Sequence, residues 1–542
     1  MQDNPQKKNS TTFNPLFAMA GIQRMATSRS SALLLSNIRI TVSERDINNI
    51  PRQGAIITVS NRPTGVIEEF ILLQLLQRRR DDFIFLKNEF LQETESLPKK
   101  LFCKNSAHGI EHMLHDDACL ALFPAGAISR FQTPQLSYTD SKWDKNLLAA
   151  LHALDLPVIP VYLSFLDDNI TRLLGMLHPA LKVRRLITHL VENKQVPVRV
   201  RIGKPIVRSK TGIDNAQRFG RFLRAKLYSL GSALEVEQFY APKQEQNIVD
   251  KINPEIIRQE LDEIRDENCI GTQGDFEIYL AKAKKIPHTL NEIGRLREIT
   301  FRNVGEGTLK SIDLDEFDLH YLHLFLWDKK REKIAGAYRI GAGDYIMKSI
   351  GKKGFYLRSL FTFDNALNDI LEQSLELGRS FVADEYQKNR LPLFLLWKGI
   401  EHFIRNNPQL KYIIGPVSIS SRYSKISRSL LVAYIKKYHW DETLAAHVKS
   451  KNPFKPDWQG LDVEPLLDIE QADINKFNKI IEEMEPANLK MPVLLKKYFS
   501  QNARIIAFNV DPDFNDSLDG FMISEISNMP KEVFGSASVP KE

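Results

Sequence analysis

The stretch HLFLWDKKREKIAGAYRIG, residues 323–341, carries the strongest structural signal of the C-terminal half. Two apolar arms flank a polar centre, a pattern typical of a β-hairpin. Further along, LELGRSFVA (375–383) predicts a buried strand, LPLFLLWKGIEHFIR (391–405) a helix, and KYIIGPVSI (411–419) another strand. Because strands alternate with helices, we expect an α/β domain here.

The N-terminal half shows a second α/β pattern, in which short apolar or β-branched runs are bounded by Pro, Gly or Asn. Helical stretches separate these runs, which predicts a largely parallel sheet with covering helices. The runs are GAIITVS (54–60), ACLALFPAG (118–126), PVIPVYLSF (157–165) and VPVRVRIGKPI (196–206). The expected fold class is therefore α/β with two domains, and a charged helical connector joins them.

The expected domain boundaries follow from these patterns. The first α/β domain spans residues 36–210, the connector 211–275 and the second α/β domain 276–520. A polar tail is expected at 521–542. Before the first domain lies an N-terminal tail, 1–35, whose apolar and basic residues suit either an interfacial helix or a helix packed on its own domain.

Bulk composition narrows the class of protein. A chain of 542 residues is too long for one core. A net charge of +7 suits an acidic partner or an anionic membrane surface, and without a concentrated basic stripe we expect no nucleic-acid binding. Three widely spaced cysteines indicate a reducing compartment and no metal site. The histidines near 108–115 favour an amphipathic helix over a metal centre. No apolar run approaches about 18 residues, so no membrane-spanning helix is expected.

Charged residues of the C-terminal half stand in or beside strongly apolar segments. Because an unpaired buried charge is costly, we expect them to form one buried polar network. Any single pair could simply tie a helix to the sheet, but a cluster of this size is typical of a functional site. The predicted members are Arg297, Asp315, Asp318, Arg339, Glu376 and Arg379.

These residues carry a family resemblance. The order Arg-x-x-x-Phe (Arg297, Phe301), Asp-x-x-Asp, Gly-x-x-Arg and Glu-x-x-Arg resembles the acyl-homoserine-lactone synthase branch of the GNAT fold and the N-acyltransferases of aminolipid synthesis. The resemblance implies transfer of a fatty acyl chain from acyl carrier protein, or from acyl-CoA, to an amino group. The Trp of the synthase branch is missing near Glu306. The segment 384–392 lacks the glycines of a coenzyme A pyrophosphate loop, which favours acyl carrier protein as the donor.

Chemistry suggests a role for each member of the network. An amine attacks only when unprotonated, so a carboxylate must take its proton. Glu376 is the first candidate for this base and Asp318 the second. Arg339 and Arg379 would orient these acids or bind the carboxylate of the acceptor. Backbone N–H groups of the central strand would stabilise the oxyanion.

The N-terminal half carries a second set of blocks: SNRPTGVIEEF (60–70), LFPAGAISR (122–130), PVIPVYL (157–163) and VRIGKPI (200–206). Their order resembles the glycerol-phosphate acyltransferase superfamily, in its hemolysin-like branch, over roughly residues 36–210. The family's first block supplies Asn-His and then Asp as the catalytic pair.

Here the catalytic pair of that family is altered. Asn61 is kept, but Arg62 stands at the His position and Glu68 at the Asp position. A guanidinium is always protonated and cannot act as a base, so we expect the fold to survive and the usual route to be lost. Arg130 would hold an anionic head group or be a surface arginine at a strand end. The residues of the second block that follow the family, and are candidates for substrate binding, are Phe123, Pro124, Gly126, Ser129 and Arg130.

Together the two halves resemble two-domain aminolipid synthases of the Bacteroidetes type, such as bifunctional ornithine lipid synthases. The resemblance implies an acyltransferase of membrane lipid synthesis that makes ornithine- or glycine-type lipids, with an N-terminal domain that is inactive or acts by another route. The alternative is a non-catalytic lipid-binding or scaffolding protein built from decayed acyltransferase domains. Expected partners are acyl carrier protein, an amino acid or lyso-lipid acceptor, and the inner face of the cytoplasmic membrane, with no tightly bound cofactor. We expect a cytoplasmic, peripheral protein.

Overall fold

The computed structural model describes residues 37–65, 67–86, 102–103, 118–126, 129–132, 137–140, 142–165, 181, 184–186, 188–189, 192, 194–232, 245–458, 462–469, 473–485 and 489–530. The chain forms two compact units. Unit 1 combines residues 1–238 with 458–488, and unit 2 combines 239–457 with 489–542. The expected N-terminal helix and the histidines near 108–115 lie outside the described residues.

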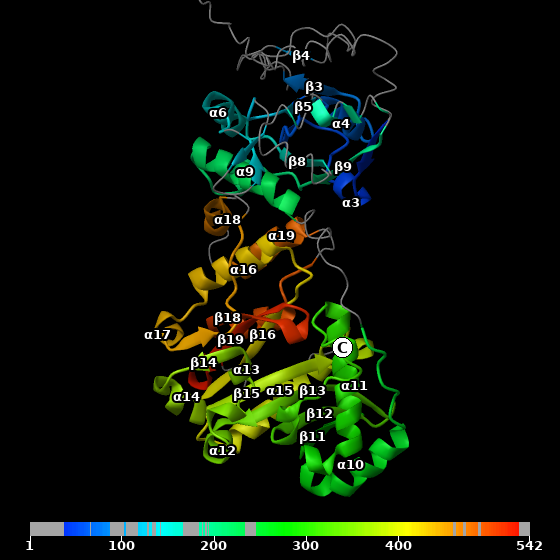
Figure 1. Cartoon of the computed structure of the whole chain (residues 1–542), viewed down its shortest axis with the longest axis vertical. Helices are drawn as coiled ribbons and strands as arrows, with labels where there is room; N and C mark the ends of the chain where they lie inside the picture. Colours follow the sequence, from blue (N-terminus) through cyan, green and yellow to red (C-terminus); the bar gives the residue numbers. More distant parts are fainter. Residues whose placement is uncertain are drawn as a thin grey trace, which may run out of the picture. The chain divides into compact units, whose positions relative to one another are not determined.

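Unit 1 is built on a seven-stranded sheet in the order β1-β9-β8-β2-β5-β3-β4 (Figure 1). Every neighbouring pair is parallel except β8 and β9. The predicted largely parallel sheet is thus confirmed. The strands are β1 Ile38–Thr41, β2 Ile56–Ser60, β3 Phe83–Leu86, β4 Phe102–Cys103, β5 Cys119–Leu122, β8 Val158–Phe165 and β9 Val196–Ile202, with a separate hairpin of β6 Arg130–Gln132 and β7 Ser137–Thr139.

Helices cover the sheet of unit 1, and all residues of β2 and β5 are buried. A parallel sheet covered on both faces needs such continuous apolar strands. At Gly220 and Gly231, helix α9 approaches the side chains of Leu148 and Tyr162 closely. The helices are α3 Glu44–Ile47, α4 Glu68–Leu76, α6 Lys145–Leu154, α9 Ala216–Ser232, α18 Glu464–Ile469 and α19 Ile474–Met484.

The two units do not follow the expected boundaries throughout. Residues 458–488 were expected within the second domain, yet they pack with unit 1. Lys226 of α9 donates to Glu483 of α19 at 2.8 Å, and Arg201 of β9 donates to the Met484 carbonyl at 3.1 Å. These contacts join residues more than 200 positions apart in the sequence, so no local pattern predicts them. The expected connector, 211–275, is itself divided between the units.

Unit 2 is built on an eight-stranded sheet in the order β10-β11-β12-β13-β15-β16-β19-β18 (Figure 1). All neighbours are antiparallel except β15 and β16. The predicted hairpin is confirmed as β12 and β13. The strands are β10 Cys269–Gln273, β11 Phe276–Lys282, β12 Leu322–Asp328, β13 Lys333–Ala342, β15 Ser374–Val382, β16 Tyr412–Ile419, β18 Arg504–Asp511 and β19 Ser517–Glu525, with a separate pair of β14 Phe361–Phe363 and β17 Val448–Ser450.

The expected polar tail from residue 521 is wrong in its first part. Strand β19 continues to Glu525 and pairs with β16 along its whole length. The apolar residues of this strand, such as Phe521 and Ile523, stand among polar residues and give no clear strand pattern. The strand with which it pairs lies about 100 residues upstream. The stretch therefore reads as polar sequence until its neighbours in the sheet are known.

Helices cover both faces of the unit 2 sheet. Gly399 of α15 lies against Leu324 of β12, whose cross-strand partner is Tyr338. The next residue, Arg339, points to the opposite face and reaches the side on which α11 packs against β13 and β15. The helices are α10 Pro254–Asn268, α11 Pro287–Val304, α12 Gly343–Ser349, α13 Leu357–Leu360, α14 Asn368–Glu372, α15 Leu391–Arg405, α16 Lys425–Tyr438, α17 Glu442–Ala445 and α20 Val493–Ser500.

The parallel strands β15 and β16 separate after a short paired segment. They pair at Ser374, Leu375 and Glu376 of β15, and the pairing stops there, although β16 stays paired with β19 to its end. At the separation point, a methyl group added to Gly415 would overlap the Leu377 carbonyl oxygen, so only glycine fits. Beyond this point the facing edges of β15 and β16 are not paired with each other.

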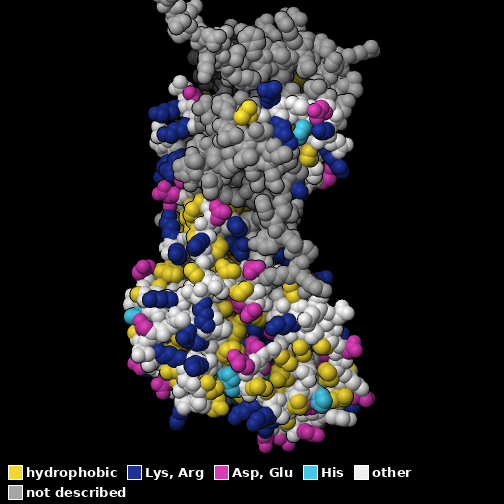
Figure 2. Space-filling view, in the orientation of Figure 1, with side chains coloured by type: hydrophobic (Ala, Val, Ile, Leu, Met, Phe, Trp, Pro, Cys, Tyr) yellow, Lys and Arg dark blue, Asp and Glu magenta, His cyan; other side chains and the backbone are white. Residues whose placement is uncertain are grey.

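The surface of unit 2 carries mixed charge. Figure 2 shows Lys and Arg side chains interspersed with Asp and Glu on the visible face, with hydrophobic side chains between them. A charged partner would therefore dock on a local patch of this face rather than on a broad field of one sign. In the described part of the chain, no helix has both the length and the apolarity to cross a bilayer.

Candidate active site

Unit 2 gathers five of the six predicted charged residues into one ion-pair network. Arg297 of α11 donates to Asp318 at 2.8 Å. Arg339 of β13 contacts the other oxygen of Asp318 at 3.3 Å and also donates to Asp315. Arg379 of β15 donates to Asp315 at 3.0 Å. Arg297 and Arg339 are fully buried, so the network joins a helix, a turn and two strands inside the unit.

The two aspartates are held by their own short turn. Asp315 caps the single 3₁₀ turn Glu316–Leu319: its side chain accepts from the Phe317 N–H at 3.0 Å, and its own N–H donates to Asp318 at 2.9 Å. Burial alone would raise the pKa of Asp318, but Arg297 and Arg339 outweigh it and hold that pKa well below its usual range. Asp318 therefore stays ionised and is a poor proton acceptor.

Arg379 reaches the network through an irregular backbone. Its φ of 49° lies in the left-handed region, which disfavours side chains, and the register between β13 and β15 shifts beside it. Such a bulge re-aims a side chain. The Arg379 guanidinium lies 4.6 Å from the Tyr356 ring centre and 4.3 Å from that of Phe514, and it donates to Asp313 at 3.2 Å. The strained position is consistent with a functional role.

Glu376 joins the site in a different way from the other five. Its carboxylate accepts from the Tyr321 hydroxyl, from the Tyr356 N–H at 3.1 Å and from the Leu357 N–H at 2.8 Å. Burial raises its pKa, while these donors act in the opposite direction. The contacts assign Glu376 the task of fixing Tyr321 and the start of α13, a positioning role that differs from the expected role as base.

Three aromatic rings surround the Arg339 guanidinium. The ring centres of Phe317, Tyr321 and Tyr356 lie at 5.7, 5.3 and 5.1 Å. Two buried donor nitrogens of Arg339 have no hydrogen-bond partner among the described groups, and the negative ring faces offer a substitute. Arg339 is fully buried and holds the two aspartates in place. Phe301, one turn after Arg297 on α11, is half-buried.

A second set of carboxylates lies on the far side of Arg379 and was not predicted from the sequence. Asp511 and Asp519 on β18 and β19 are both 4% exposed, and Glu306 follows the end of α11. Burial raises the pKa of Asp519 to about 7, with repulsion from Asp511 adding to it. Burial and the charge of Asp519 raise that of Glu306 to about 8. The missed signal lay in FNVDPDF (508–514) and SLDG (517–520), where acidic residues border apolar strands.

In unit 1 the altered motif forms a closed set of contacts. Arg62 donates to Glu69 at 2.7 Å and to the Gly65 carbonyl at 3.2 Å. Glu68 accepts from the N–H groups of Thr64 and Gly65, so it caps the turn before α4. Asn61 pairs with the backbone of Leu163 in β8 in both directions, at 2.9 and 2.8 Å. The arginine is therefore paired with Glu69, and Glu68 is not its partner.

The second block of unit 1 meets the first at the ends of β2 and β5. The Ser129 N–H donates to the Arg62 carbonyl at 2.9 Å, and its hydroxyl donates to Asp140 at 2.6 Å. Phe123 is buried, with its ring centre 5.3 Å from the Arg62 guanidinium. Pro124 accepts from the Asp144 N–H at 3.3 Å. Gly126 has a φ of 62°, and Arg130 lies in β6, its side chain outside the described atoms.

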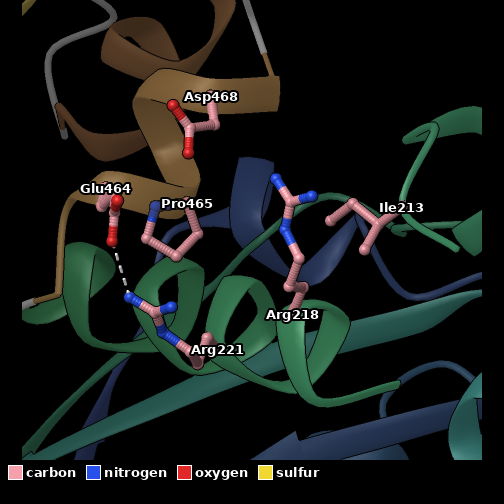
Figure 3. A pocket seen from close by; sticks show the side chains of 6 residues that line it. All are labelled: Ile213, Arg218, Arg221, Glu464, Pro465 and Asp468. Atoms are coloured by element: carbon pink, nitrogen blue, oxygen red, sulfur yellow. Dashed lines mark hydrogen bonds and ion pairs between the residues drawn. The ribbon is translucent and has the colours of Figure 1, made fainter. Parts of the chain in front are cut away.

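A cavity of about 170 Å³ in unit 1 lies away from this motif (Figure 3). It lies between the start of α9 and α18. Arg221 lines it and is already paired with Asp462 at 2.6 Å and Glu464 at 3.0 Å. None of the predicted site residues lines this cavity, whose walls are Ile213, Arg218, Arg221, Glu464, Pro465 and Asp468.

Comparison with known proteins identifies relatives of the chain. Residues 296–397 match the acetyltransferase (GNAT) domain family. The chain is 31% identical over 268 residues to the glycine N(alpha)-acyltransferase of Phocaeicola vulgatus, covering 47% of this chain and 80% of that protein. It is 33% identical over 207 residues to the glycine N(alpha)-acyltransferase of Bacteroides thetaiotaomicron, covering 36% of this chain and 61% of that protein.

Solved structures show weaker likenesses. The 1-acyl-sn-glycerophosphate acyltransferase PlsC of Thermotoga maritima is 14% identical, with a TM-score of 0.26, and covers 42% of this chain and 83% of that one. The acyl-homoserine-lactone synthase LasI is 11% identical, with a TM-score of 0.20, and covers 35% of this chain and 96% of that one. Likenesses at these scores support no conclusion.

Proposed function

The chain belongs to the family of the glycine N(alpha)-acyltransferases, and we propose that unit 2 transfers a fatty acyl chain from a thioester donor to the amino group of a small amino acid. The observation that carries this proposal is the buried network of Arg297, Asp315, Asp318, Arg339 and Arg379, which overlaps the matched GNAT domain. Glycine is the first acceptor to test because both relatives are glycine N(alpha)-acyltransferases. Ornithine is the second, as the sequence pattern suggests.

The separation of β15 and β16 supports a thioester donor with an extended arm. Past Glu376, the facing edges of these strands do not pair with each other, and backbone groups need hydrogen-bond partners. The phosphopantetheine arm shared by acyl carrier protein and coenzyme A carries two amides that can supply them. The reactive carbonyl would then lie beside Arg379 and Tyr356, where backbone N–H groups can stabilise the oxyanion.

The reaction itself needs a free amine at the donor carbonyl. The amine nitrogen attacks the carbonyl carbon, the carbon–sulfur bond breaks, and the thiolate takes the second amine proton as it leaves. Arg379 meets the acceptor carboxylate, since its guanidinium is held flat between Tyr356 and Phe514. Arg339 and Asp315 fix Arg379 in place and make no contact with the substrate.

The test uses the purified full chain with long-chain acyl carrier protein, or the matching acyl-CoA, and single amino acids. Mass spectrometry should show an N-acyl product with glycine or ornithine. Arg379→Met should lower kcat/KM for the amino acid at least tenfold, while Arg258→Met, an exposed arginine of α10, should not. If glycine, ornithine, serine and lysine all fail to give an N-acyl product, the proposal is wrong.

We further propose that unit 1 does not transfer acyl groups by the histidine-based route. The ion pair of Arg62 with Glu69 occupies the place of the catalytic pair, and a permanently charged guanidinium cannot accept a proton. The competing role is lipid binding or scaffolding without catalysis. O-acyl transfer to a lyso-lipid by the full chain, abolished by Glu68→Gln, would contradict this proposal.

We propose that unit 2 works on the surface of the cytoplasmic membrane, where its product belongs. Three large apolar side chains, Leu319, Tyr345 and Ile350, are 72%, 53% and 44% exposed. They lie in one region, because His320 contacts the Gly354 carbonyl at 2.9 Å and Gly354 packs against Ile350. The neighbouring lysines at 348 and 353 form no ion pair among the described residues. Apolar insertion beside cationic side chains suits an anionic lipid surface.

A further inference from the structure

We propose that Asp519 takes the proton from the acceptor amine, and that Asp511 and Glu306 complete with it a subsite for the ammonium group. The inference rests on the proposed N-acyl transfer and names the proton acceptor that this reaction needs. It replaces the expected base, since the oxygens of Glu376 hold Tyr321 and α13 and Asp318 is locked in ion pairs.

The sheet register puts Asp519 on the working face of unit 2. Glu376 pairs with Gly341, two residues from Arg339, and with Ile414 on β16. Four residues after Ile414, Ser418 is therefore on the same face, and its direct partner on β19 is Asp519. Asp519 thus shares a face with Glu376 and Arg339, on the far side of the point where β15 and β16 separate.

Asp519 is oriented by a short contact from the neighbouring strand. The Ser418 hydroxyl donates to one of its oxygens at 2.5 Å. The Asp519 carboxylate forms no ion pair in the described part of the chain. Arg379 acts on Asp519 through its charge, while two of its donor groups hold Asp313 and Asp315. The carboxylate is oriented but not neutralised, as a base must be.

The neighbouring strand adds a second carboxylate and an unused hydroxyl. Asp511 on β18 lies two residues beyond Asn509, the partner of Asp519, so both acids point to the same face. The Tyr356 hydroxyl donates to Asp511 at 3.4 Å, which ties it to the ring stacked on Arg379. Ser517, opposite Asp511, is fully buried, and its hydroxyl lies near Asp519 and acts to lower the pKa of that carboxyl, yet makes no well-formed hydrogen bond with any described group. A buried polar atom without a well-formed hydrogen bond beside two acids points to a missing polar ligand.

Glu306 approaches from the end of α11. The preceding Gly305 has a φ of 80°, lies against the Arg422 side chain, and its carbonyl accepts from Asn515 at 3.3 Å. Asn515 belongs to the turn between β18 and β19, so Glu306 is brought to the strands that carry Asp511 and Asp519. The Arg422 guanidinium donates to the carbonyls of Asn303 and Arg302, at 2.5 and 3.1 Å. The Glu306 N–H donates to the Phe301 carbonyl at 2.8 Å, whereas its carboxylate forms no hydrogen bond or ion pair among the described residues.

The charge balance favours a cationic ligand. Three carboxyl groups gather where the nearby guanidiniums already have partners, and their charged forms are costly to bury together unless a cation joins them. A primary ammonium supplies that cation with three donors for Asp519, Asp511 and Glu306. The raised pKa of Asp519, about 7, places its proton exchange in the range where a base works best at neutral pH.

The step balances without an added reactant. The ammonium gives one proton to the Asp519 carboxylate, and the free amine attacks the thioester carbonyl. The carbon–sulfur bond breaks, an amide forms, and the leaving thiolate takes the second proton from nitrogen. Release of the proton from Asp519 to water then restores the carboxylate for the next turnover.

The experiment compares the full chain with Asp519→Asn, Asp519→Glu, Glu306→Gln and the control Glu525→Gln, an exposed acid at the end of β19. Initial rates with acyl donor and glycine are measured from pH 5.5 to 9. Wild-type kcat should fall about tenfold per unit below pH 7, because protonated Asp519 cannot act. Asp519→Asn should lower kcat at least about 100-fold and remove this acid limb. Asp519→Glu should keep the limb, and Glu306→Gln should raise KM for the amine.

Calorimetric titration of each variant with glycine reads the subsite independently of turnover. Asp519→Asn should weaken glycine binding at least tenfold, while Glu525→Gln should not. If wild type is active and Asp519→Asn keeps its rate within threefold and its acid limb, the assignment of the base is overturned. If no turnover occurs, the N-acyl transfer proposal is wrong. The ammonium subsite is then judged by binding alone: it is overturned if wild type and Asp519→Asn bind glycine equally, or if neither binds it.

Discussion

Asp318→Asn should destabilise unit 2 strongly, because Asp318 is the ion-pair partner of a fully buried guanidinium. Arg297 is 0% exposed, and its ion pair in the described part of the chain is with Asp318, at 2.8 Å. Asparagine keeps the shape but removes the charge, which leaves Arg297 buried without compensation. Removal of one partner from a buried pair costs about 3–5 kcal/mol.

Removal of the arginine instead of the aspartate should lower the stability of unit 2 by less. In Arg297→Met, Asp318 keeps Arg339 at 3.3 Å and the Asp315 N–H at 2.9 Å, so the loss should be about 1–3 kcal/mol. Because the two residues interact, the double variant should cost less than the sum of the single variants. This asymmetry distinguishes a buried ion pair from simple loss of packing.

Hydrogen exchange of the full chain, read by mass spectrometry on peptides covering β13, measures the effect locally. A loss of about 3–5 kcal/mol should speed exchange there by two to almost four orders of magnitude. The exposed variant Asp513→Asn serves as the control. The pKa of Asp318 is lower in the folded than in the unfolded chain, so ionised Asp318 stabilises the fold above about pH 4 and this stabilisation is lost as the pH falls further. The difference in stability between wild type and Asp318→Asn should therefore become smaller in acid. Exchange within fivefold of wild type would refute the reasoning.

Three further predictions follow from single contacts. Glu376→Gln should keep kcat within tenfold, since an amide oxygen can still accept from α13, whereas a loss beyond about 100-fold would return the role of base to Glu376. Burial raises the pKa of Glu69 to about 7, against attraction from Arg62, so unit 1 should lose on the order of 3 kcal/mol as pH rises from about 4.5 to 7. Urea titrations should show that loss, and Glu69→Gln should abolish it. Finally, Leu319→Asp and Lys353→Glu should each weaken sedimentation with phosphatidylglycerol vesicles about tenfold, and equal binding to neutral vesicles would contradict the membrane patch.

Much of the fold of unit 2 was predictable because its signals are local. The hairpin around residues 323–341, the strand at 375–383 and the helix at 391–405 each follow from apolar periodicity within a short window. Strand β19 was missed, and so was the return of 458–488 to unit 1. In both, the partner lies far along the chain, where periodicity carries no information.

The polar network was predictable for a different reason. Charges such as Arg339 in an apolar strand must find partners, and this requirement follows from desolvation alone. The requirement does not say which partner each charge takes. The sequence suggested Glu376 as base and placed Glu68 at the family's Asp position, whereas in the structure both carboxylates accept from backbone N–H groups.

By itself the sequence determined that there are two α/β units, that unit 1 lacks a histidine base at position 62, and that charges must gather on β13 and β15. These properties depend on residue type and on spacing within a few turns. Only the tertiary structure decided that Arg62 pairs with Glu69, and that Asp519 faces Ser418 beside Arg379. The second pairing joins residues about 100 positions apart, and a shift of one residue in the β16–β19 register would turn Asp519 to the other face.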